Sequence, residues 1–217
     1  MFDVFKWDGP VYHFLIWVWK LLVINFLILL TSLPIITIGA SQTAAFVTIR
    51  AIKNQETVAL IKTFLKAFVA HFKVSTFIWL GALFWYYWLI VCWRYTVVYG
   101  LPIWYVIGLA IVSFFSISGL QYLLFYRSYV EDSFKVSLAN SIKLTLAYPV
   151  QSLTLSLLLG LPLLMGLINS KLLILAIYSS SFIGLSVIQE LRSRIMLRIF
   201  ATIQRKQERE NCEKTIY

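Results

Sequence analysis

Five long apolar stretches constrain the fold of this chain more than any other feature. They are Val11–Ile38, Val74–Trp93, Leu101–Tyr126, Leu146–Ile168 and Leu172–Ile188. A helix crosses the hydrocarbon core with about 20 mainly apolar residues, and lipid requires every backbone polar group to find a partner within the protein. The sequence therefore predicts an all-α, polytopic integral membrane helix bundle with about five transmembrane helices, folded as a single domain over residues 1–217.

The composition agrees with this class of protein. Of the 217 residues, 60% are hydrophobic and 13% are charged, whereas soluble domains carry about 25% charged residues. The net charge of +10 lies mostly close to the predicted spans. It favours the lipid bilayer, with anionic lipid headgroups on the cytoplasmic face, as the partner. We expect no nucleic-acid partner.

Basic residues sort onto every second connection between the spans. Fifteen of the nineteen Lys and Arg residues follow the first, third and fifth stretches, and the other four are Lys6, Lys20, Arg94 and Lys171. Connections rich in Lys and Arg stay in the cytoplasm. The pattern predicts a multi-pass protein of the cell membrane, with its N-terminus outside and its C-terminus cytoplasmic. Lys20 then lies at the outer edge of the first span, and residues 190–217 form a basic cytoplasmic tail.

Several connections are expected to form helices at the inner leaflet. The predicted helices are Gln42–Lys53, Thr57–Lys73, Glu131–Thr145 and the tail over residues 190–210. In the last three, apolar residues recur every four positions: Phe64, Phe68 and Phe72; Leu138, Ile142 and Leu146; Leu191, Ile195, Ile199 and Ile203. Such a stripe is typical of a helix lying in the headgroup plane. For Thr57–Lys73, packing against the inner ends of the bundle needs the same stripe, so both alternatives stay open.

Four polar residues are candidates for function. Asn25 and Gln121 are amides within predicted spans, where such groups either bond a neighbouring helix or contact a substrate. Arg127 ends the third span and is either a functional charge or a cation favoured by the end of the helix. Asn140 lies on a predicted inner helix, where an amide commonly caps a helix or bonds a loop.

Aromatic residues gather on the predicted outer side, which holds seven of the eight Trp residues. Trp85, Trp88, Trp93 and Trp104 lie near span ends that meet at one short loop. They are candidate ligand-facing aromatics, because flat rings stack on sugar faces. The alternative is an interfacial belt of the kind found in most membrane proteins, although a belt is expected at both faces.

The sequence carries no motif of an enzyme or a metal protein. His13 and His71, and likewise Cys92 and Cys212, fall on opposite sides of the predicted membrane. Neither a Gly-rich phosphate loop nor an HExxH or GxSxG motif occurs. We therefore expect no catalytic residues, no cofactor and no metal.

Two stretches resemble a known family. The first runs from NFLILLTSLPIITIGA (Asn25–Ala40) through Thr43–Ala45, Lys53 and Glu56 to FLKAFVAHFK (Phe64–Lys73). The second comprises Leu124–Arg127, Ser133 and Ala139–Ser141. Together they resemble the YesL family of bacterial membrane proteins, a domain of unknown function. The resemblance implies a protein of five or six spans, encoded near genes for sugar uptake and polysaccharide use. The family has no established site residues, so none are carried over.

The predicted function is that of a non-catalytic accessory component of carbohydrate uptake or utilisation, with a sugar transporter subunit as a partner. The alternative is a small-solute transporter or channel subunit. Transport predicts polar residues that converge in the bundle core. In this sequence they are few and scattered, which favours the accessory role and leaves the oligomeric state open.

Overall fold

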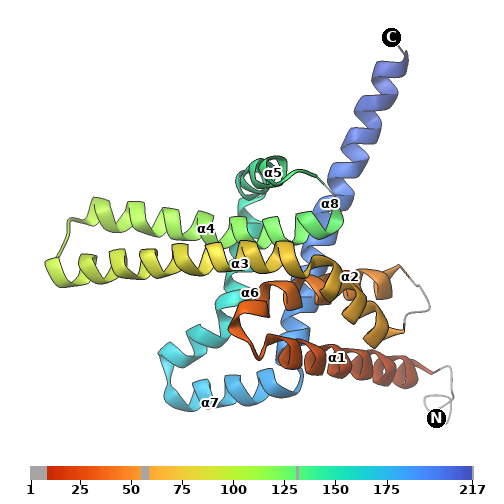
Figure 1. Ribbon diagram of the computed structural model, residues 1–217, viewed down its shortest axis with the longest axis horizontal. Coiled ribbons are helices and arrows are strands. Elements are labelled where there is room, and N and C mark those ends of the chain that lie inside the picture. Colours follow the sequence, from red (N-terminus) through yellow and green to blue (C-terminus); the bar gives the residue numbers. More distant parts are fainter. Residues whose placement is uncertain (1–8, 55–58, 131, 217) are drawn as a thin grey trace.

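The computed structural model describes residues 9–54, 59–130 and 132–216, and the described chain is helical almost throughout (Figure 1). The elements are α1 (Pro10–Ser32), η2 (Ile35–Thr37), α2 (Ile38–Lys53), α3 (Leu60–Tyr99), α4 (Ile103–Tyr129), α5 (Phe134–Ala147), α6 (Pro149–Ile168), α7 (Ser170–Ser179), η3 (Ser180–Gly184) and α8 (Leu185–Ile216). No strand occurs within these ranges. The all-α prediction is confirmed.

Five helical stretches are long and apolar enough to cross a membrane. They are Val11–Ser32, Ile35–Lys53, Leu60–Tyr99, Ile103–Tyr129 and Ser170–Arg205. The pair α5–α6, bent by 102° at Tyr148, passes the same test as one broken span. The membrane class is therefore confirmed, but the set of spans differs from the predicted five. Ile35–Lys53 is an additional candidate, and the predicted span Leu146–Ile168 qualifies only as part of the broken pair.

The first predicted span, Val11–Ile38, is confirmed as far as Ser32 but ends too late, because the chain reverses at Pro34. α1 ends before Pro34, which cannot continue a helix, and α2 returns along α1. At the turn, the Thr31 hydroxyl donates to the Ser41 hydroxyl at 2.8 Å, and Ser41 donates to the Ile28 carbonyl at 3.3 Å. The predicted inner helix Gln42–Lys53 is instead part of α2, the second helix of a hairpin with α1.

This hairpin brings Lys20 and Lys53 to the same end, where they line one cavity. The charge pattern alone placed them on opposite sides of the membrane. The rule that basic connections stay inside, applied to Lys53, puts the start of α1 in the cytoplasm. The hairpin thus predicts a cytoplasmic start of α1, whereas the charge pattern of the whole chain predicts an N-terminus outside.

Cysteine labelling decides between the two topologies. In a Cys92→Ser, Cys212→Ser background, Tyr12→Cys and Asn54→Cys should behave alike, and an impermeant maleimide should leave both unlabelled in intact cells. Tyr99→Cys, at the α3–α4 turn, is the control from the opposite end of α3. Labelling at position 12 without labelling at position 54 would contradict the hairpin.

Small residues fill the contacts of α2 with its neighbours. The buried residues of α2 are Gly39, Ala40, Ser41, Thr43, Ala44, Ala45, Phe46, Thr48, Ile49 and Ala51. Lipid offers no hydrophobic driving force between helices, so close backbone approach and interhelical hydrogen bonds hold them together. The Thr43 and Ser75 hydroxyls, for example, lie 3.2 Å apart across the α2–α3 contact. The contacts of α2 are therefore built largely on small side chains.

The predicted amphipathic helices pack in two different ways. Thr57–Lys73 is not a separate surface helix: from Leu60 it is the start of α3, and Phe64 is fully buried in a cluster with Ile24 and Ala44. Of the two alternatives for this segment, packing against the bundle is confirmed. In α5 the apolar stripe of Leu138, Ile142 and Leu146 is exposed, and the buried residues are Ser137, Ser141, Leu144 and Thr145.

The predicted surface helix of the tail is wrong for its first half. α8 runs without a break from Leu185, and its contacts include α1, α2 and α6. Arg192, Ser193, Met196, Ile199 and Phe200 are buried. The side chains from position 206 onward lie outside the described residues.

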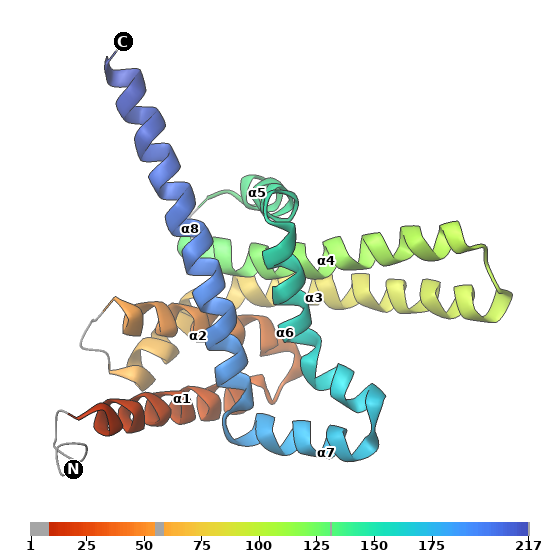
Figure 2. The same ribbon diagram turned by 180° about the vertical axis from the view of Figure 1, so that it is seen from behind.

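Two features extend from the bundle in both views (Figures 1 and 2). α3 and α4 run side by side as a long hairpin, whose far half reaches well beyond the other helices. α8 extends in another direction, and the chain changes course between α7 and α8 at the π-helical segment η3. We call the α3–α4 hairpin the arm.

Candidate functional site

A buried arginine occupies the crossing of α2, α4 and α8. Arg192 of α8 is 3% exposed. Its Nε donates to Oε1 of Gln121 at 3.1 Å, and its Nη1 donates to Oε1 of Gln42 at 3.3 Å and to Oε1 of Gln189 at 3.1 Å. Gln189 also donates to the Gln42 backbone carbonyl at 3.0 Å. We call these four residues the polar centre.

The polar centre holds a cation with neutral partners. In the described part of the chain, the hydrogen-bond acceptors of Arg192 are amide oxygens rather than carboxylates, and its guanidinium lies 5.1 Å from the centroid of the Phe125 ring. A buried charge is costly unless its hydrogen bonds are satisfied, and an ionisable group within a membrane bundle marks a functional position by default. Chemically, the centre can fix the helix crossing or receive an anion.

The sequence pointed to one of the four residues of this site, Gln121. Of the two alternatives for Gln121, its bond to Arg192 of α8 supports contact with a neighbouring helix. Arg192 was missed because it was counted with the basic tail. The available signal was the spacing of Gln189 and Arg192, three residues apart on one helix face, beside small Ser186 and Ser193.

Asn25 forms a second site, at the corner between α7 and α8. Its side chain is 1% exposed. Nδ2 donates to the carbonyls of Ser180 at 3.1 Å and Ser181 at 2.9 Å, and Oδ1 accepts from the Ser186 N–H at 3.0 Å. A π-helical turn disturbs the usual backbone pairing, and one amide here bonds groups on both sides of it. Of the two alternatives for Asn25, these bonds support contact with a neighbouring helix.

Gly184 is required at the same corner. A Cβ at this position would lie 2.9 Å from the Ser179 carbonyl oxygen of the same helical stretch. The close approach that excludes a side chain is therefore internal to the π-helical turn, rather than a contact between two helices.

Arg127 and Asn140 belong to a separate network at the α4–α5 connection. Arg127 donates to the Asp132 backbone carbonyl at 2.9 Å. Asn140 donates to the Tyr126 hydroxyl at 2.9 Å, and that hydroxyl donates to Oδ2 of Asp132 at 2.7 Å. These bonds support the helix-end role for Arg127 and the loop-bonding role for Asn140.

The candidate aromatics lie on the arm, and Trp85 and Trp93 form hydrogen bonds between its two helices. Trp85 Nε1 donates to the Ser116 hydroxyl at 2.9 Å, and Trp93 Nε1 donates to the Ser113 hydroxyl at 3.1 Å. The rings of Trp85 and Trp88 are 5.1 Å apart. These Trp–Ser bonds fix α3 against α4.

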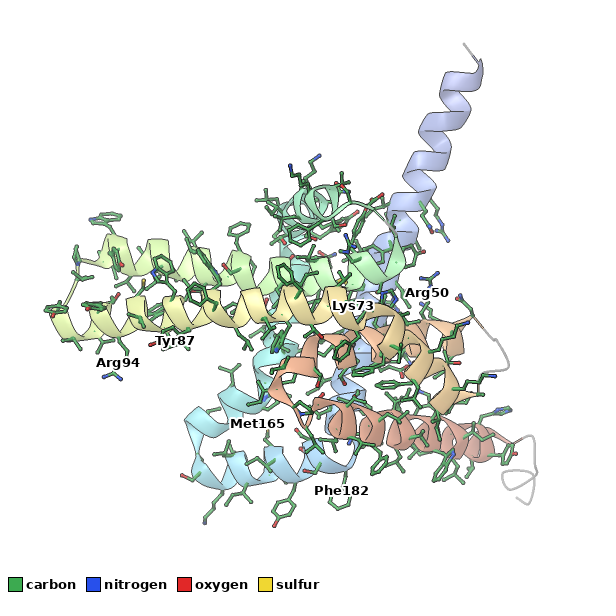
Figure 3. All side chains as sticks on the ribbon, viewed as in Figure 1. Arg50, Lys73, Tyr87, Arg94, Met165 and Phe182 are labelled. Atoms are coloured by element: carbon green, nitrogen blue, oxygen red, sulfur yellow. The ribbon has the colours of Figure 1, made fainter. Side chains whose placement is uncertain are left out.

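The structure does not gather the four tryptophans into one cleft. Trp85 and Trp93 line different grooves, and Trp104 is exposed. Figure 3 shows the neighbouring Tyr87 and Arg94 pointing away from the arm. This arrangement does not support a single sugar cleft.

Comparison with known proteins gives one match. The family described as "Protein of unknown function, DUF624" matches residues 21–93. Neither a curated protein nor a solved structure matches the chain. The matched range includes Asn25 and Gln42, whereas Gln121 and Arg192 lie outside it. Over this range, which runs from α1 into α3, the chain is similar to a domain of unknown function.

Proposed function

We propose that this protein is a non-catalytic membrane protein that acts by contacting another membrane protein, as an accessory component of carbohydrate uptake or utilisation. The observation that carries the proposal is the arm. Its far half extends away from the bundle in both views, and its outer faces are large and aromatic, with Phe84 78% exposed. Aromatic residues are enriched where proteins contact one another.

Two further points support this role. The polar side chains that a carrier would present to a solute are bonded to one another here, as in the polar centre and at the α7–α8 corner. The resemblance of Asn25–Lys73 to the YesL family supports carbohydrate uptake as the process, with a sugar transporter subunit as the partner.

Photo-crosslinking tests the proposal in cells growing on a polysaccharide. A photoreactive phenylalanine at Phe84, on the arm, should form an adduct with the membrane subunit of a sugar transporter. The matched control is the same residue at Phe26 of α1, which is 64% exposed and should yield mainly lipid adducts. The proposal fails if both positions give only lipid, or the same proteins.

The alternative is a small-solute transporter or channel subunit, and Arg192 is the observation that favours it. A buried cation with amide partners, on a helix that follows a π-helical turn, resembles an ion or substrate position in a bundle. Protein purified and reconstituted alone in liposomes distinguishes the two functions. Sugar uptake that is lost in Arg192→Gln would favour transport, and absence of uptake would favour the accessory role.

A further inference from the structure

A second concentration of charge lies where α1, α2 and α8 meet. A cavity of about 360 Å³ opens there. Four cations from three distant parts of the sequence line it: Lys20, Lys53, Arg194 and Arg198. Glu190 is the acid in its lining. We call this cavity the cationic pocket.

The negative charge of Glu190 is already engaged. Its Oε1 accepts from Nε of Arg194 at 2.9 Å and from Nε1 of Trp17 at 3.5 Å. Lys20, Lys53 and Arg198 have no acidic partner among the residues that the structure describes. Lys20 is half-buried, and Lys53 and Arg198 are exposed. Cations gathered around one cavity make the local potential positive and raise the local concentration of anions.

The rest of the lining is apolar. Leu21, Ile49 and Ile52 form one wall, and Trp17 completes it. A site with cations on one side and aliphatic side chains on the other fits an amphiphile, with a charged head and a hydrocarbon tail. Basic pockets between helices at a membrane face bind anionic lipid headgroups in this way, and arginine suits the geometry of phosphate oxygens.

We propose that the cationic pocket binds a phosphate-bearing anion. The apolar wall favours the headgroup of an anionic phospholipid, and free phosphate is the other source of the same chemistry. α1, α2 and α8 all contribute, so the bound anion joins the two ends of the chain at one membrane face.

The test uses the full-length protein purified in mild detergent, with bound lipid counted by native mass spectrometry. Phosphatidylglycerol, phosphatidylcholine and inorganic phosphate are titrated separately. We expect one phosphatidylglycerol to be retained, at least tenfold more tightly than phosphatidylcholine. Competition by inorganic phosphate at equal concentration would identify free phosphate as the source, and failure to compete would identify the lipid.

Matched variants locate the site. Lys53→Gln with Arg198→Gln should weaken retention at least tenfold. Lys135→Gln with Lys143→Gln, which removes the same charge from exposed positions on α5, should change it less than twofold. Glu190→Gln should strengthen retention, a gain that misfolding does not produce. Equal retention of phosphatidylcholine, or equal weakening by both double variants, would overturn the proposal.

Discussion

Replacing Gly39 with alanine should lower the thermal unfolding midpoint of the protein in detergent by several degrees. The added Cβ would lie 2.7 Å from Cβ of Trp79 and 2.8 Å from the Ser75 carbonyl oxygen. Neither atom is the end of a flexible side chain, so α2 and α3 must move apart. Overpacking of this kind costs about 1–3 kcal/mol, and each kcal/mol corresponds to about 2–4 °C in a chain of this size.

The same separation should weaken two hydrogen bonds beside Gly39. These are the contact between the Thr43 and Ser75 hydroxyls and the bond from Trp79 Nε1 to the Ile35 carbonyl, at 2.9 Å. Gly119→Ala on α4 is the matched control, because no heavy atom lies within 4 Å of its added Cβ and alanine favours the helix. Similar midpoints for the two variants would mean that α2 and α3 are not in such close contact.

The second large effect is expected at Arg192. Arg192→Leu keeps much of the side-chain volume, but it leaves the Oε1 atoms of Gln42, Gln121 and Gln189 without their shared donor. Each interhelical hydrogen bond lost within a membrane bundle costs about 0.6–2 kcal/mol. We therefore expect a lower unfolding midpoint in detergent and faster proteolysis of α8.

Two variants control for the loss of charge. Arg194→Leu removes a cation two residues away whose side chain is 53% exposed, and it should change the midpoint little. Arg192→Lys keeps the charge but not the planar fork that reaches several oxygens, so it should lie between Arg192→Leu and the unchanged protein. If Arg192→Leu is as stable as Arg194→Leu, the polar centre does not hold the helices together.

The membrane class was predictable from the lengths of the apolar stretches, but the reversal of the chain at Pro34 was not. Val11–Ile38 is mainly apolar throughout, and hydropathy alone cannot distinguish one long span from a helix and its turn. What makes the turn is the fit of α2 between α1 and α3, which depends on Gly39 and on the hydroxyls of Thr31 and Ser41. Those are contacts between segments, which a periodic pattern does not encode.

The amphipathic pattern of α5 and the outward-facing apolar stripe were predictable, but the burial of its polar face was not. A stripe of Leu138, Ile142 and Leu146 divides the helix into two faces. In a soluble protein the apolar face turns inward. Where the surroundings are lipid, small polar residues such as Ser137 and Ser141 pack against other helices and the leucines face outward.

The burial of Arg192 could not be predicted from the sequence for a related reason. Its neighbours along the chain read as a basic tail, because Arg194, Arg198 and Arg205 follow closely. The acceptors that make its burial tolerable come partly from Gln42 and Gln121, on helices far away in the sequence. Asn25 and Gln121 could be predicted as interhelical donors or acceptors from their position in apolar sequence, but their partners could not.

The hydrogen bonds of Asn25 to the α7–α8 corner have a consequence for the order in which parts of the protein fold during synthesis. Asn25 is synthesised 155 residues before Ser180, whose carbonyl it binds. During synthesis the Asn25 side chain therefore lacks these bonding partners until the segment from Ser180 to Ser186 has entered the membrane. The bend between α7 and α8 thus closes as a late step of biogenesis, and a ribosome that stops before Ser186 releases a chain in which this joint cannot be completed.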